Sequence, residues 1–170
     1  MTATINSVEE YLKSMLIVRS SEDPPKNRGY RWNSVEELLL EQGERHRWKP
    51  LPHGIKPMPP RQCFSNALWL LMKRPTRFIY VEGYAHRYIP THHAWLLDRD
   101  GLAVDPTWTG DPELDPGRDY FGIPFKHDWV MARYVSSEPY FGMLHDWWTD
   151  YSSMRADPNE FRVRRKEVHG

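Results

Sequence analysis

The sequence predicts a single α+β domain in which helices come first and an antiparallel sheet follows. Three observations lead to this prediction. The length of 170 residues suits one domain. Three helix signals precede residue 74, and from residue 77 onward the apolar pattern changes to a period of two. Because 39% of the residues are hydrophobic and 14% are aromatic, the chain can build a sizeable core, which excludes a disordered protein.

Composition also excludes several functional classes. The 23 Lys and Arg residues balance 23 Asp and Glu residues. We therefore do not expect the protein to be a nucleic-acid binder of the strongly basic class. A single Cys excludes an internal disulfide framework and a cysteine-rich zinc site. No apolar run is long enough to cross a membrane, and the first residues lack the pattern of a signal peptide. We therefore expect a cytoplasmic protein without metal, cofactor or membrane partner.

The first 50 residues contain two copies of the string Asn-Ser-Val-Glu-Glu, one starting at Asn6 and the other at Asn33. In each copy the serine can cap a helix and the second glutamate can complete a capping box. We predict one helix after Ser7 and another after Ser34. Residues 1–50 are therefore expected to form a helical N-terminal arm.

A proline-rich connector and a third helix follow. Residues 49–60 carry 5 of the 15 prolines, which predicts an extended segment, either a linker or an ordered strap across a groove. Residues 62–73 are predicted to form an amphipathic helix, because their apolar side chains recur at helical spacing: Phe64, Ala67, Leu68, Leu71 and Met72.

The remaining pattern is that of strands and loops. Residues 77–84, 93–98 and 102–105 are rich in β-branched, aromatic and other apolar residues, and the last two flank a Gly-containing turn that predicts a hairpin. We expect a long loop over residues 106–128 and a fourth strand over residues 129–135. The aromatic stretch 140–155 is expected to form a last helix, and the basic tail 161–166 a solvated end.

Cys63 stands at the start of the amphipathic helix. A helix N-terminus presents free N–H groups and a partial positive charge. Both stabilise a thiolate, which is the nucleophilic form of cysteine, and the same N–H groups can hold an oxyanion. The alternative is that Cys63 is a small buried hydrophobic residue, as free cysteines often are.

A cysteine nucleophile needs a base, and the base needs a group that orients it. If Asp98 faces Leu102 across the predicted hairpin, His93 and Asp105 share one face of the sheet and lie within diagonal reach. We therefore expect an imidazole–carboxylate contact. The alternatives are an edge histidine and, because Pro106 follows, an aspartate that only forms a turn.

His92 is the rival of His93 for the role of base. Neighbouring residues of a strand point to opposite faces, so His92 and His93 cannot both face Asp105. We expect His92 to be dispensable. Adjacent histidines that point apart also make a metal site at this strand an unattractive interpretation.

Three short motifs then occur in a fixed order: Gln62-Cys63-Phe64, His93-Ala94-Trp95 and Asp105-Pro106-Thr107-Trp108. Together they resemble the transglutaminase-like branch of the papain-like cysteine enzymes, over about residues 58–110. The resemblance implies a papain-like core in which the nucleophile helix packs on an antiparallel sheet. It also implies a Cys-His-Asp catalytic triad, which corresponds here to Cys63, His93 and Asp105.

The activity implied by the resemblance is acyl transfer from an amide or ester carbonyl, as in a protease, deamidase or transglutaminase. The substrate would be a protein, a peptide or a small amide. Two other interpretations stay open: a catalytically inactive papain-like module that binds or regulates, and an arylamine-type acetyltransferase, for which no coenzyme A site is recognisable. The sequence indicates no oligomeric state.

Further residues are expected around the triad. Gln62 and Asn66 would support the oxyanion or the site, and Trp95, Trp108 and Tyr84 would wall the substrate cleft, unless these aromatics belong to the core. Residues 120–125 are a candidate loop to cover the site. The expected domain then has three parts: the helical arm 1–50, a catalytic core over residues 58–135, and an aromatic and basic segment over residues 136–170.

Overall fold

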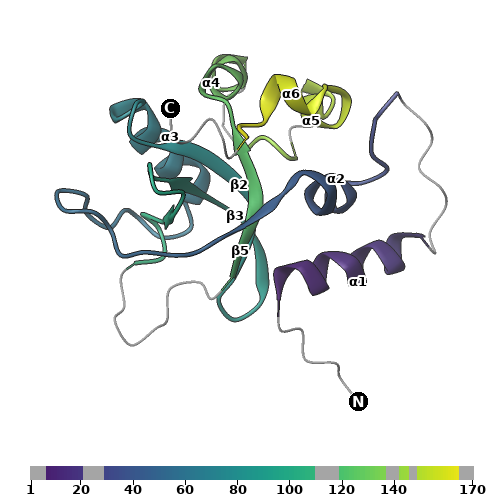
Figure 1. Cartoon of the computed structure of the whole chain (residues 1–170), viewed down its shortest axis with the longest axis horizontal. Coiled ribbons are helices and arrows are strands. Elements are labelled where there is room, and N and C mark those ends of the chain that lie inside the picture. Colours follow the sequence, from purple (N-terminus) through teal and green to yellow (C-terminus); the bar gives the residue numbers. More distant parts are fainter. Residues whose placement is uncertain (1–6, 21–28, 110–118, 137–141, 146–148, 165–170) are drawn as a thin grey trace.

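The computed structural model describes residues 7–20, 29–109, 119–136, 142–145 and 149–164, and these form a mixed α+β fold around a curled antiparallel sheet (Figure 1). The five strands lie in the order β1-β5-β2-β3-β4. Their bounds are Glu44–His46 (β1), Ile79–His86 (β2), Pro90–Leu97 (β3), Ala103–Val104 (β4) and Asp119–Phe125 (β5). The helices are α1 (Val8–Ser20), α2 (Val35–Gln42), α3 (Cys63–Lys73), α4 (His127–Ser136), α5 (Ser152–Arg155) and α6 (Pro158–Phe161).

The two N-terminal helices begin at the serines that the sequence indicates. The Ser7 Oγ accepts a hydrogen bond from the Glu10 N–H at 3.1 Å, and the Ser34 Oγ accepts one from the Glu37 N–H at 3.2 Å. Side chains of both helices are fully buried in the same hydrophobic core as the sheet: Val8, Leu12, Leu38 and Leu39. The predicted arm is therefore an integral part of the core.

The sheet has two different faces. The helix face carries Tyr80, Glu82 and Tyr84 of β2 with His92, Ala94 and Leu96 of β3, and its apolar residues pack against side chains of the helices. The far face carries Val81, His93, Trp95 and Leu97 from the same strands and forms a smaller cluster with Tyr120 and Trp48. Because side chains alternate along a strand, His92 and His93 lie on opposite faces, as expected.

The connector 49–60 is an ordered strap rather than a loose linker. It contains no helix or strand, yet its ends are tied to β4 and to the turn that follows β4. The Lys49 N–H donates to the Ala103 carbonyl at 3.0 Å, and the Met58 N–H donates to the Pro106 carbonyl at 2.8 Å.

The prediction of a strand over residues 129–135 is wrong, because this segment belongs to α4. Residues four apart interact there as they do on a helix: the Arg133 guanidinium lies 3.3 Å from the centre of the Trp129 ring. Val130 is fully buried in the core. A short run of aromatic and aliphatic residues fits a strand or a buried helix equally well, and here tertiary packing decides.

The missing strand is β5, which lies inside the segment predicted as a loop. All seven of its residues are buried, so residues 120–125 do not cover the site. Pro124 misled the prediction, since proline removes a donor from the sheet ladder. It is tolerated because β1 pairs only as far as Gly122, and beyond that point the Pro124 carbonyl accepts from the Val163 N–H at 2.9 Å.

The last helix is shorter than predicted. Within residues 140–155 the described part contains only α5, and residues 140–141 and 146–148 lie outside the described ranges. The chain then forms α6, which the sequence analysis missed although Asp157 and Glu160 make a complete capping box around Pro158. The end of the basic tail also lies outside the described residues. No helix in the described ranges is long and apolar enough to span a bilayer.

Candidate active site

Cys63 is the first residue of α3 and only 9% of its surface is exposed. Gln62 precedes it as the N-cap and makes no capping hydrogen bond with its side chain. Arg61 has a φ of 64°, a left-handed conformation that is uncommon for a residue other than glycine. The first turn of the helix therefore presents its N–H groups without competition from a capping side chain.

His93 and Asp105 are brought together where β3 and β4 separate. Leu96 pairs with Val104, in the register that the hairpin predicts, and β4 ends there. The next residue, Asp105, turns its carboxylate toward His93, and the His93 Nε2 lies 2.7 Å from the Asp105 Oδ2. Both residues are buried, with 2% and 0% of their surfaces exposed. The expected contact between them is present.

The Asp-Pro-Thr-Trp motif explains how Asp105 is held. Its Oδ1 accepts hydrogen bonds from the Thr107 N–H at 2.8 Å and the Trp108 N–H at 3.2 Å, so the carboxylate caps its own turn. Its Oδ2 accepts a third bond from the Tyr120 hydroxyl at 3.0 Å. One oxygen thus fixes the backbone, and the other faces the imidazole.

The charges of the pair reinforce one another. Burial alone lowers the pKa of His93, but the Asp105 carboxylate and a hydrogen bond with Cys63 outweigh burial and raise the pKa to about 9. Burial raises the pKa of Asp105, but the imidazolium and the two backbone N–H groups prevail and lower it. At neutral pH the pair is therefore an imidazolium and a carboxylate. The His93 imidazole is hydrogen-bonded to Asp105, and Cys63 is near enough to contribute to the rise in its pKa.

Asn66 lies one turn along α3 from Cys63 and is almost fully buried. Its side-chain amide donates to the Pro59 carbonyl at 2.7 Å and to the Thr107 Oγ1 at 3.0 Å. Asn66 therefore connects the strap, the nucleophile helix and the turn that holds Asp105. Gln62 is exposed, and its backbone carbonyl accepts a hydrogen bond from the Asn66 N–H at 2.8 Å.

Of the three aromatics expected to wall a cleft, only Trp108 lies against the site. Its half-buried ring stacks on the His93 imidazole, with 4.0 Å between ring centres. Trp95 is fully buried and packs edge-on against Tyr120, so the expectation that it lines an open cleft is wrong. Tyr84 lies on the helix face, where its ring is 5.7 Å from that of His92, so it is separated from His93 by the sheet.

The structure contains a second histidine–carboxylate pair that was not predicted from the sequence. On the helix face, the His92 Nε2 lies 2.8 Å from the Oε1 of Glu82, which is fully buried. The Leu144 N–H donates to Glu82 at 2.9 Å, the Met143 N–H donates to its other oxygen, and the Tyr80 hydroxyl donates at 3.2 Å. One feature of the sequence could have indicated this pair: Glu82 is a charged residue within an otherwise largely apolar strand, β2.

The chain matches no family model, no curated protein and no solved structure. Within the described ranges, no group of three or more His, Cys, Asp or Glu side chains is arranged to hold a metal ion.

Proposed function

We propose that the protein is a cysteine-dependent acyl-transfer enzyme that acts on an amide or ester carbonyl, with Cys63, His93 and Asp105 as its catalytic triad. One observation carries the proposal: the buried hydrogen bond between His93 and Asp105 lies near the sulfur of Cys63, which helps to raise the pKa of the imidazole and stands at an uncapped helix N-terminus. The order and spacing of the three motifs, which resemble those of transglutaminase-like enzymes, support the same assignment.

The mechanism starts from the state in which the proton of Cys63 resides on His93, so that a thiolate lies near an imidazolium. Since the Nε2 of the ring is bound to Asp105, the nitrogen left for the sulfur is Nδ1. Asp105 holds the ring in one orientation and stabilises the imidazolium that forms. A protonated imidazole beside the sulfur supplies the positive charge that a reactive thiolate needs.

The thiolate then attacks the substrate carbonyl and forms a tetrahedral intermediate. The N–H groups of the first turn of α3 stabilise the negative oxygen. His93 then gives its proton to the leaving amine or alcohol, and the carbon–nitrogen or carbon–oxygen bond breaks to leave an acyl thioester on Cys63. Water or an amine, deprotonated by His93, attacks this thioester and regenerates the thiol.

The proposal covers protease, deamidase and transglutaminase-like chemistry, which differ in the leaving group and in the molecule that accepts the acyl group. Candidate substrates are therefore peptides, proteins and small amides. Asn66 and Gln62 act as positioning residues in this scheme, because their described contacts are with the segments that hold the triad.

The test is to trap the acyl-enzyme. The protein is incubated with panels of peptides, glutamine amides and activated thioesters, and the adduct is read by intact mass. Because Cys63 is the only cysteine, an adduct that is lost in Cys63→Ala is located without further mapping. We expect an adduct with wild type and none with the variant. Turnover that persists in Cys63→Ala, or an inert sulfur in the folded wild type, would contradict the proposal and favour a binding module.

A further inference from the structure

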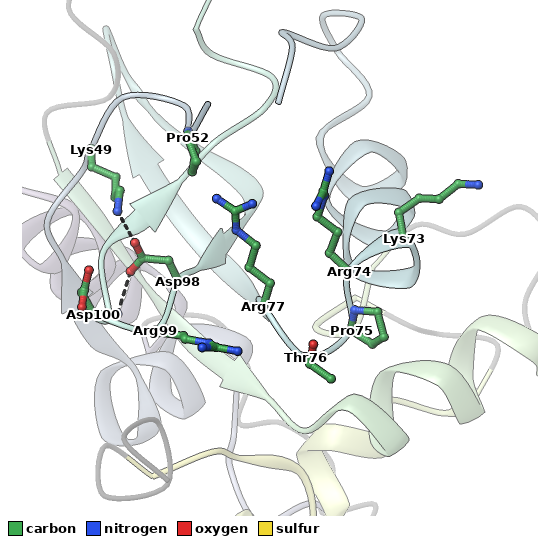
Figure 2. A pocket seen from close by; sticks show the side chains of 10 residues that line it. All are labelled: Lys49, Pro52, Lys73, Arg74, Pro75, Thr76, Arg77, Asp98, Arg99 and Asp100. Atoms are coloured by element: carbon green, nitrogen blue, oxygen red, sulfur yellow. Dashed lines mark hydrogen bonds and ion pairs between the residues drawn. The ribbon is translucent and has the colours of Figure 1, made fainter. Parts of the chain in front are cut away.

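A second region with the features of a site lies at the opposite end of α3 from Cys63. A pocket of about 650 Å³ opens there between three segments. They are the strap at Lys49 and Pro52, the turn of residues 73–77 that connects α3 to β2, and the β3–β4 turn at residues 98–100 (Figure 2). Since α3 spans Cys63–Lys73 and a helix rises 1.5 Å per residue, this pocket is roughly 15 Å from the sulfur.

The pocket carries a local excess of positive charge. Five of its lining residues are cationic (Lys49, Lys73, Arg74, Arg77 and Arg99), against the two carboxylates of Asp98 and Asp100. The whole chain has a net charge of +0, so this concentration does not follow from composition. The geometry of the three segments gathers cations that are far apart in the sequence.

One of the two carboxylates is already bound. The Asp98 carboxylate forms an ion pair with Lys49 and accepts hydrogen bonds at 3.0 Å from the Asp100 N–H and the Leu102 N–H. These bonds shape the β3–β4 turn, in which Gly101 adopts a φ of 73°. The contacts of Asp98 are therefore with its own turn and with Lys49. It forms no ion pair with the other described cationic side chains that line the pocket.

Three guanidinium groups remain. Among the described residues, no carboxylate is in ion-pair contact with Arg74, Arg77 or Arg99. Figure 2 shows the side chains of Arg74 and Arg77 extending in the same direction from the turn after α3, with Arg99 on the neighbouring turn and Lys73 pointing away. The Arg77 N–H donates to the Arg74 carbonyl at 3.0 Å, which fixes the spacing of these two arginines. These three positive charges would therefore attract an anion that enters the pocket.

We propose that this pocket binds a small molecule that carries two or more phosphate groups. Arginine matches the geometry of phosphate oxygens with paired N–H donors, and three arginines can contact more than one phosphate group. A volume of about 650 Å³ lies in the range of small-molecule sites. Apart from Thr76, the walls are charged residues and prolines, so charge rather than an apolar surface would recognise the ligand.

The experiment titrates the full chain with inorganic pyrophosphate, tripolyphosphate and citrate at low ionic strength. Binding is followed by calorimetry and by backbone amide chemical shifts. We expect saturable binding of both phosphate compounds, with shifts confined to residues 49–52, 73–77 and 98–101, and at least about tenfold weaker binding of citrate. Absence of saturable pyrophosphate binding, or equally tight citrate binding, would overturn the proposal. Shifts centred on Cys63 and His93 would do the same, because they would place the anion in the other site.

A matched pair of variants assigns the effect to the pocket. Arg74→Gln/Arg99→Gln removes two exposed charges from its walls, and Lys13→Gln/Arg47→Gln removes two exposed charges elsewhere. We expect the first variant to weaken pyrophosphate binding by at least about tenfold and the second by less than about threefold. Equal losses in both variants would show a general charge effect and reject a defined site. Labelling of Cys63 should be unchanged in both variants, so this test is independent of the catalytic proposal.

Discussion

His92 and His93 are neighbours in the chain, and each contacts a buried carboxylate, yet the two pairs lie on opposite faces of the sheet. The distances are nearly the same: 2.8 Å from His92 to Glu82 and 2.7 Å from His93 to Asp105. A histidine–carboxylate distance therefore does not identify a catalytic pair. What differs is the set of other groups that each carboxylate and each imidazole contacts.

Glu82 holds distant parts of the chain together. It accepts backbone hydrogen bonds from Met143 and Leu144, which lie far along the sequence, and a Cβ added to Gly142 would come within 2.6 Å of its Oε1. The rings of Phe64 and His145 lie against His92, with centres 4.8 Å and 4.6 Å away. These contacts indicate a structural role, in which a buried charge is stabilised by several donors.

Asp105 has a more local task. The backbone N–H groups that donate to its Oδ1 belong to its own turn. Its Oδ2 contacts the His93 Nε2 and accepts a hydrogen bond from the Tyr120 hydroxyl. Cys63 lies near enough to His93 to contribute to the rise in its pKa. Of the two pairs, only the pair on the far face lies near the cysteine, which is the proposed nucleophile.

The largest expected effect separates the two histidines directly. Removing the proposed base with His93→Gln should slow alkylation of Cys63 by iodoacetamide at pH 7 by about 10²- to 10⁴-fold, the usual contribution of a positioned base. His92→Gln should change the rate by less than about threefold, provided that circular dichroism shows both variants folded. Equal slowing in both variants would mean that the sheet does not separate their roles.

The carboxylates should differ in the opposite sense. Glu82→Gln leaves two backbone N–H groups facing an amide that offers only one acceptor oxygen, and we expect it to lower the free energy of unfolding by about 3 kcal/mol. Reactivity of its Cys63 should be nearly unchanged. Asp105→Asn should reduce the reactivity at least about tenfold, because the ring loses the charge that orients it. Urea unfolding and alkylation rates, measured on both variants, make the comparison.

The sequence predicted the far-face pair because its geometry depends on local features. The hairpin register follows from a Gly-containing turn, and the same register fixes the parity of His93 and Asp105. Cys63 at a helix start follows from the apolar spacing of α3. Short-range rules were therefore sufficient for the contact between His93 and Asp105, and their role in catalysis stays a prediction.

The helix-face pair could not be predicted in the same way. Glu82 is held by Met143 and Leu144, which lie 61 and 62 residues further along the chain, after β5 and α4. The assignment of β5 failed for a related reason. Its Pro124 is allowed only because β1 stops early, and the sequence gives no sign of where β1 stops. Long-range packing, rather than local propensity, decides both cases.

The third prediction concerns pH. Because the pKa of His93 is raised from 6.5 to about 9, its protonated form stabilises the folded state fully below pH 6.5, and this contribution is lost as the pH rises through 9. The wild type should therefore lose stability between these values, by up to about 3 kcal/mol, and this loss should be much smaller in Asp105→Asn. The rate of Cys63 alkylation should change most steeply near pH 9 in the wild type, and at a lower pH in Asp105→Asn. A pH dependence that is identical in the two proteins would contradict the assignment.

The smallest expected effect tests the comparison with two matched tyrosines. Tyr120 donates to Asp105 at 3.0 Å and Tyr80 donates to Glu82 at 3.2 Å, and both side chains are buried. Changing either one to Phe removes one hydroxyl from a buried carboxylate and should lower the free energy of unfolding by about 1 kcal/mol. The stability losses should therefore be alike, but only Tyr120→Phe should also slow alkylation of Cys63, by a fewfold, because the Asp105 oxygen it releases is the one that orients His93. If Tyr80→Phe slowed the alkylation of Cys63 equally, loss of either hydroxyl would act through a general loss of stability. The two faces of the sheet would then not be chemically independent.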